Sequence, residues 1–145
     1  MHLLSLELCS VGRGRGIGSK CQLRSVLVEA RMATEMNQGF VRMFEGNYAK
    51  AAKHFGSVCK EDPKSPVASN NHAICLLYDG GLTKAPPPLE KFVTKKMEGV
   101  HEGVVFNLCT MYELGSSDAA GKKRALLPIV LSRASEAFSG DALKL

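Results

Sequence analysis

The sequence has 145 residues, of which 45% are hydrophobic and 23% charged, as is ordinary for one soluble globular domain. Its net charge of +5 is dispersed, whereas a nucleic-acid surface needs denser Lys and Arg with aromatic residues between them, so no nucleic-acid partner is expected. No apolar run approaches the ~20 residues of a membrane span, so direct membrane insertion is not expected either. The five cysteines are odd in number and form no CxxC motif, which is typical of reduced thiols in the cytosol.

The N-terminal segment contains the glycine-rich stretch "VGRGRGIGSK", which suggests a phosphate-binding loop. Its spacing does not fit, because the glycines alternate with other residues and miss the G-x-G-x-x-G pattern. The other phosphate loop needs glycine immediately before Lys20, where Ser19 stands. We therefore expect residues 1–20 to be poorly ordered or atypical, and we expect no nucleotide or other cofactor.

Residues 21–145 are predicted to form an all-α domain of helical hairpins. Apolar stripes predict one helix within residues 32–43 and a second within residues 48–61, ended by Asp62 and Pro63, with Gly46 in the turn between them. Two such helices hide their apolar faces only by packing together. The spacing matches a tetratricopeptide (TPR) repeat, whose period is about 34 residues.

About three such units follow one another, over residues 32–65, 66–101 and 102–140. The helical spacing in residues 21–31 indicates the end of a preceding repeat. Small residues are expected where helices cross closely, and large residues where they fill the space between helices. The predicted packing residues are Gly39, Tyr48, Ala51, Phe55, Ala73, Leu82, Ala85, Leu89, Leu108 and Tyr112.

Three consecutive prolines, Pro86 to Pro88, interrupt the second unit where a helix is expected. Each proline disfavours helical backbone in the residue before it, so we predict that the helix begins near Pro88 and leaves Pro86, Pro87 and Ala85 outside it. Leu89, Phe92, Val93 and Met97 form its predicted apolar stripe. Another proline, Pro128, falls inside the last predicted helix, where it removes a hydrogen-bond donor.

Particular stretches point to a family. At "SNNHAICLLYDGGL", "EGVVFNLCTMYELGSS" and "DALKL" the sequence resembles the C-terminal TPR region of the subunit 12 family of the trafficking protein particle (TRAPP) complex, and "MNQGFVRMFEGNYAKAAKHF" fits the same region. The resemblance covers roughly residues 32–145 and fades upstream, so the chain is expected to be a fragment of a longer protein.

The resemblance implies a noncatalytic scaffold subunit of a vesicle-tethering complex in transport from the endoplasmic reticulum (ER) to the Golgi. Other TRAPP subunits are its implied partners. The implied location is the cytoplasm, with association to ER–Golgi intermediate or Golgi membranes through the complex. Nucleotide exchange on the Rab-type GTPase is attributed to the small core subunits of the complex, so the resemblance implies no catalytic residue.

The residues themselves offer little support for an enzyme. His72 and Cys75 stand three apart on a predicted helix and are within reach of one metal, but a structural zinc site needs four ligands and no second pair has a comparable spacing. His54 and Cys59 are five apart and do not share a helix face, which argues against a nucleophile pair. We predict no catalytic, cofactor or metal residues.

Asn37, Asn71 and Asn107 occupy the same position in the first helix of each unit, on the side expected to line the concave groove of a TPR stack. An asparagine side chain both donates and accepts, so stacked copies can hold an extended peptide backbone. Equally, asparagine can be a tolerated polar residue between core positions. The alternative function is therefore a standalone TPR adaptor that binds extended peptides through these asparagines. A clamp for acidic C-terminal tails is disfavoured, because Ala33, Val67 and Gly103 stand where lysines are needed.

Overall fold

The computed structural model describes residues 18–95, 100–134 and 138–143, so most of the segment 1–20 lies outside the described residues. The first helix, α1 (Gly18–Phe44), already includes Lys20 and runs on without a break, since no proline or turn sequence interrupts it. The chain divides into two compact units, a first unit of residues 1–31 and a second unit of residues 32–145, and all three predicted repeats fall within the second unit. In the first unit, apolar side chains of α1 at Leu23, Val26 and Leu27 are exposed.

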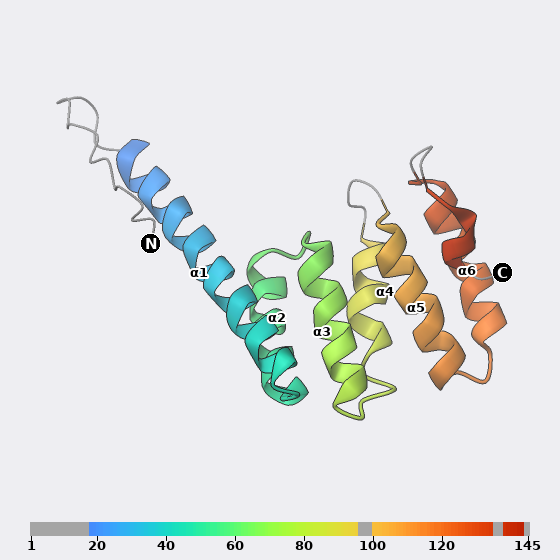
Figure 1. Cartoon of the computed structure of the whole chain (residues 1–145). Coiled ribbons are helices and arrows are strands. Elements are labelled where there is room, and N and C mark those ends of the chain that lie inside the picture. The colour runs from blue at the N-terminus through green and yellow to red at the C-terminus, as the bar shows by residue number, and fades with distance from the viewer. Residues whose placement is uncertain (1–17, 96–99, 135–137, 144–145) are drawn as a thin grey trace. The chain divides into compact units, whose positions relative to one another are not determined.

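The second unit is a succession of antiparallel helices, shown in Figure 1. After the second half of α1 come α2 (Tyr48–Glu61), α3 (Pro66–Tyr78), α4 (Pro86–Thr94), α5 (Glu102–Gly115), α6 (Ala119–Leu131) and the short 3-10 helix η1 (Gly140–Leu143). Contacts join α2 to α3, α3 to α4, α4 to α5 and α5 to α6, so each helix packs against the next. The described residues contain no strand, and the predicted all-α helical-hairpin fold is confirmed.

Two turns of the second unit repeat the same hydrogen-bond geometry 34 residues apart. Gly46 and Gly80 have positive φ values of 74° and 81°, which glycine adopts without steric cost and which end α1 and α3. The glycine N–H and the following N–H each donate back to the helix. The bonds are Gly46 to Met43 (3.0 Å) and Asn47 to Arg42 (2.8 Å), repeated as Gly80 to Leu77 (3.1 Å) and Gly81 to Leu76 (2.9 Å). The turn between the two helices of a pair is therefore built by the same backbone bonds in the first two pairs.

The buried side chains form two clusters, one around α2 and α3 and one around α3 to α6. Of the predicted packing residues, most are buried: Gly39, Ala51, Phe55, Ala73, Ala85, Leu89, Leu108 and Tyr112. Tyr48 is half-buried and stacks on Tyr78, with ring centroids 4.9 Å apart. Leu82 is 37% exposed, because it lies in the turn before α4 rather than within a helix.

The start of α4 differs from the prediction. The helix begins at Pro86, so the expectation that Pro86 and Pro87 are extended and that the helix begins near Pro88 is wrong. Ala85, the residue before it, has helical backbone angles (φ −73°, ψ −42°) and is fully buried. Its N–H donates to the carbonyl of Gly81 at 3.0 Å, just as Ala51 donates to Asn47 at 3.0 Å in the preceding pair. Burial of Ala85 and this helical hydrogen bond outweigh the local preference imposed by proline.

The prolines at the start of α4 occupy its first turn, where backbone N–H groups have no partner within the helix, so missing donors do little harm. Leu89 and Val93 are buried and Phe92 is half-buried, while Met97 lies outside the described residues. At the other end of the helix, the Arg133 guanidinium donates to the carbonyls of Val93 (2.8 Å) and Lys95 (2.6 Å). A side chain beyond α6 therefore caps α4.

The last helices close the described core. Asp118 caps α6 by accepting from the N–H of Gly121 at 2.9 Å, and Lys123 forms an ion pair with Glu113 of α5. Pro128 lies inside α6, as predicted, with its side chain exposed. The 3-10 helix η1 packs on α5 and buries Ala142 and Leu143.

Candidate protein-binding surfaces

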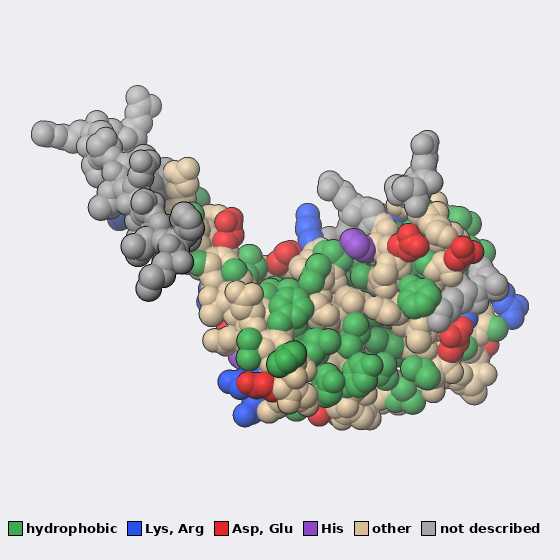
Figure 2. Space-filling view, in the orientation of Figure 1, with side chains coloured by type: hydrophobic (Ala, Val, Ile, Leu, Met, Phe, Trp, Pro, Cys, Tyr) green, Lys and Arg blue, Asp and Glu red, His purple; other side chains and the backbone are tan. Residues whose placement is uncertain are grey.

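An exposed row of large apolar side chains occurs at one repeat position in the second unit. Each of its three members lies at or next to the C-terminal end of the first helix of a pair. They are Phe44, Tyr78 and Leu114, which are 95%, 65% and 58% exposed. We call these three residues the apolar row. Figure 2 shows hydrophobic side chains gathered over the face of the second unit where α3 lies. Large exposed apolar patches on a soluble domain mark contact surfaces for other proteins.

The asparagine positions lie on the same helices as the apolar row, seven residues earlier in each: 37 before 44, 71 before 78 and 107 before 114. Seven residues are close to two helical turns, so each asparagine and its partner in the row project from about the same side of the helix. Asn37 is exposed, in a shallow hollow with Thr34 and Gln38. The second unit thus presents polar and apolar side chains in parallel on its first helices.

The structure gives one of the three asparagines a cross-helix partner. The Asn107 amide on α5 donates to Oδ1 of Asn70 on α3, with a nitrogen–oxygen distance of 2.7 Å. Asn71, the neighbour of Asn70 and the predicted peptide-binding residue, is half-buried. The pair of Asn107 and Asn70 therefore joins adjacent first helices, and peptide binding by the three predicted asparagines remains a proposal.

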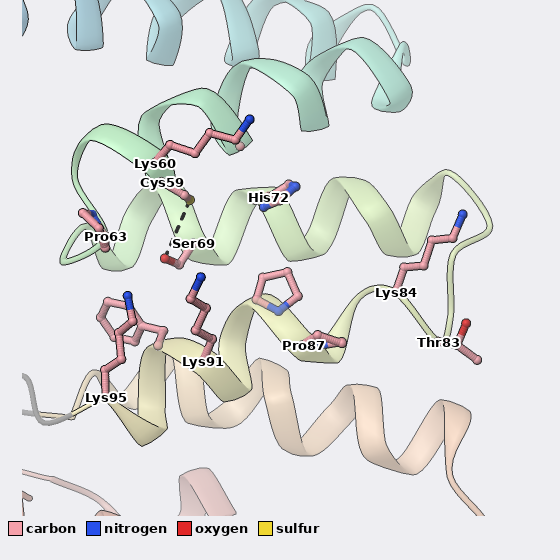
Figure 3. Close-up of a pocket in the computed structure, with 13 residues that line it drawn as sticks. Cys59, Lys60, Pro63, Ser69, His72, Thr83, Lys84, Pro87, Lys91 and Lys95 are labelled. Atoms are coloured by element: carbon pink, nitrogen blue, oxygen red, sulfur yellow. Dashed lines mark hydrogen bonds between the residues drawn. The ribbon is translucent and has the colours of Figure 1, made fainter.

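A separate groove of about 780 Å³ lies between α2 and α4, with α3 at its floor. Figure 3 shows Lys60 on α2, His72 on α3 and Lys91 on α4 around this space. We call it the basic groove, because its lining contains four lysines and no Asp or Glu. The lining residues are Gly56, Cys59, Lys60, Pro63, Ser69, His72, Thr83, Lys84, Pro87, Pro88, Lys91, Phe92 and Lys95.

Two titratable groups of the basic groove, His72 on α3 and Cys59 on α2, are shifted toward their neutral forms. Burial, with a smaller effect of the charge on Lys60, lowers the pKa of His72. Burial raises the pKa of the Cys59 thiol, and Asp62 adds to this, although the Ser69 hydroxyl 3.8 Å away acts in the opposite direction. The positive charge of the groove at neutral pH is therefore carried by its lysines.

The residues considered for metal binding or nucleophilic chemistry are separated by the fold. Cys75 is fully buried in the core, where burial raises the pKa of its thiol to about 11, while His72 faces the groove. His54 Nδ1 lies 2.9 Å from a carboxylate oxygen of Glu35, an interaction between α1 and α2. Within residues 18–95, 100–134 and 138–143, no three His, Cys, Asp or Glu side chains are grouped to hold a metal. A protonated, buried thiol is a poor nucleophile.

The apolar row and the basic groove were both missed from the sequence. The row can be found by aligning the sequences of the three repeats, because Phe44, Tyr78 and Leu114 then fall at the same position. The groove has a weaker signal: Lys91 and Lys95 share a helix face at four-residue spacing, but Lys60 and Lys84 join them only through the packing of three helices.

The fold and the exposed row define a helical-hairpin repeat protein with surfaces suited to binding other proteins. Comparison with curated proteins adds a relationship: the chain is similar to the trafficking protein particle complex subunit 12 of Homo sapiens, with 39% identity over 119 residues. The subunit 12 of Mus musculus is 40% identical over the same length. These matches confirm the resemblance to TRAPP subunit 12.

The similarity covers 81% of this chain but 16% of the human and 15% of the mouse protein, so the chain spans about a sixth of the length of these relatives. No family model matches the chain. Among the described helices, none combines the length and apolar character that a membrane crossing requires.

Proposed function

We propose that this chain is a noncatalytic scaffold that binds other subunits of a TRAPP-type tethering complex and acts in ER-to-Golgi transport. It works in the cytoplasm and reaches ER–Golgi intermediate or Golgi membranes through the complex. The similarity to TRAPP subunit 12 supports membership in such a complex. The thiols of Cys59, which is half-buried, and Cys75, which is buried, both have a raised pKa, and this supports a role without chemistry.

The observation that carries the proposal is the apolar row. Phe44 at the end of α1 is 95% exposed, an unfavourable state for a phenylalanine unless a partner covers it. Tyr78 is held in place by its stacking on Tyr48, so it presents a preorganised aromatic surface. Aromatic side chains of this kind often dominate the binding energy of protein interfaces.

The test is to express a triple variant, Phe44→Ser, Tyr78→Ser and Leu114→Ser, and to purify it with its partners from cells. We expect loss of the TRAPP subunits recovered with the parent chain. The control replaces Val67 and Leu131 by serine, because both are exposed apolar residues outside the row. Circular dichroism establishes that both variants remain helical. Recovery of an undiminished set of TRAPP subunits with the triple variant contradicts the proposal.

The alternative is a standalone adaptor that binds extended peptides through the asparagines, and it is supported by their common repeat position. Replacing Asn71 and Asn107 by alanine should abolish peptide capture if the adaptor function holds. Under the scaffold function, the same variant should still assemble with TRAPP subunits. Mass spectrometry of the material purified with each variant distinguishes the two functions.

A further inference from the structure

The basic groove concentrates positive charge, and no Asp or Glu is among its lining residues. Lys60 stands on the α2 wall, Lys91 on the α4 wall, and Lys84 and Lys95 at either end of α4. In the parts of the chain that the structure describes, none of these four lysines forms an ion pair. Clustered charges of one sign around a concave surface produce a potential that attracts anions.

The walls and floor of the groove are partly apolar. Pro87, Pro88 and Phe92 contribute from α4, and Pro63 contributes from the loop after α2. Figure 3 shows Pro87 and Lys91 on the α4 wall and His72 on α3. A lining of lysines and proline rings suits a ligand whose carboxylates alternate with apolar groups.

Glycine at position 56 allows α2 and α3 to approach each other at the floor of the groove. A Cβ atom at this position would lie 3.2 Å from Nε2 of His72, which is tighter than ordinary van der Waals contact. The His72 ring therefore rests against the α2 backbone at Gly56. It lies in the groove between the lysine-bearing walls and can report on what binds there.

Two other classes of anionic partner fit less well. Nucleic acid is usually held by arginines and several stacking aromatic rings, whereas the lining offers only the rings of Phe92 and His72 and no arginine. A membrane surface needs basic residues that project from a face, and here the lysines border a hollow. A narrow, acidic polypeptide matches both the shape and the charge.

We propose that the basic groove binds an acidic, extended peptide segment of a partner protein. Carboxylates of the peptide pair with Lys60 and Lys91 on opposite walls, and its intervening side chains lie on the proline rings of α4. The proposal goes beyond the scaffold function and does not depend on TRAPP membership, since the basic groove and the apolar row share no residue.

The experiment uses the full 145-residue chain and a fluorescein-labelled peptide of about twelve residues that alternates glutamate and proline. Fluorescence anisotropy measures the dissociation constant. We expect the variant Lys60→Gln with Lys91→Gln to bind about tenfold more weakly. The matched control, Lys50→Gln with Lys53→Gln, removes the same charge from exposed positions of α2 outside the groove and should change affinity by less than about twofold.

A second measurement locates the bound peptide. NMR signals of the His72 ring should shift when the glutamate–proline peptide is added, and should not shift with a glutamine–proline peptide. Equal weakening by the two lysine variants, unchanged His72 signals in the complex, or no binding at all would overturn the proposal. So would binding of phosphatidylserine vesicles or single-stranded RNA through Lys60 and Lys91 in preference to the peptide.

Discussion

Gly39 of α1 faces the ring of Phe55 of α2 so closely that a Cβ atom at position 39 would lie 2.8 Å from Cε1 and Cζ of that ring. Phe55 is fully buried and also makes an edge contact with Phe40, with ring centroids 5.2 Å apart. The ring therefore has little room to retreat. Close approach of the two helices depends on the absence of a side chain at this position.

We expect Gly39→Ala to lower the free energy of unfolding by about 1–2 kcal/mol, because overpacking against Phe55 exceeds the gain of up to about 1 kcal/mol that alanine brings to a helix. Urea unfolding followed by circular dichroism measures the change. Gly103→Ala, in the first turn of α5 with nothing near its missing Cβ, is the control and should not destabilise. Equal stabilisation by both variants would show that Phe55 does not confine position 39.

Ala73 of α3 is fully buried where its helix meets its neighbours. Ala73→Leu should lower the free energy of unfolding by about 1–3 kcal/mol, because the added atoms have no space. Ala49→Leu, at an exposed position of α2, is the matched control and should have little effect. Chemical denaturation of both variants provides the comparison. Parent-like stability of Ala73→Leu would mean that position 73 is not a close helix contact.

Tyr112 of α5 donates a hydrogen bond to Glu90 of α4, with an oxygen–oxygen distance of 2.9 Å. Burial, and then the bond and charge of Glu90, raise the pKa of this tyrosine well above its usual value of about 10. A raised pKa means that the folded state holds the proton more tightly, so this stabilisation is complete below about pH 10 and is lost as the pH rises through the folded-state pKa.

Tyr112→Phe should therefore lower stability by about 1 kcal/mol at pH 7 and should lose less stability than the parent between about pH 10 and 11. Urea unfolding at several pH values measures both effects. Tyr78→Phe, at an exposed ring, should retain the alkaline loss of the parent. If the two variants lose stability in parallel above pH 10, Tyr112 does not carry the effect.

Replacing proline by alanine should change the free energy of unfolding in opposite directions inside a helix and in its first turn. Pro128 lies inside α6, where it removes a hydrogen bond, so Pro128→Ala should raise the free energy of unfolding by about 2 kcal/mol. Pro87 lies in the first turn of α4, where no bond is lost, so Pro87→Ala should lower it by about 0.4–1 kcal/mol by freeing the unfolded chain. Thermal unfolding of the two variants gives the signs, and a shared sign would refute this account.

The repeat pattern predicted the helix pairs well because its strongest signals are local. Gly46 and Gly80 recur at the spacing of the turn, and Asp62 with Pro63 ends α2 at the expected place. The start of α4 was predicted wrongly, because the preference of proline against a helical residue before it is a local one. It takes no account of packing against neighbouring helices. Burial of Ala85 between packed helices reverses the local preference there.

The two candidate surfaces depend on relations that no single helix shows. Lys60 and Lys91 lie 31 positions apart in the sequence and face one groove only because α3 packs between their helices. Similarly, the hydrogen bond between Asn107 and Asn70, rather than Asn71, depends on how α5 sits beside α3. Periodicity indicates which residues share a column of the repeat, and packing decides which of them meet.

The matching turns at Gly46 and Gly80 have a consequence for how such a chain can diverge. Their geometry is made by main-chain atoms and by one glycine each, so the residues that follow them can change without altering how the next helix docks. Three prolines occupy the start of α4, downstream of the second turn, and Ala85 and Leu89 beside them are fully buried. New binding specificity can therefore arise in one helix pair of the stack while the packing of the neighbouring pairs is unchanged.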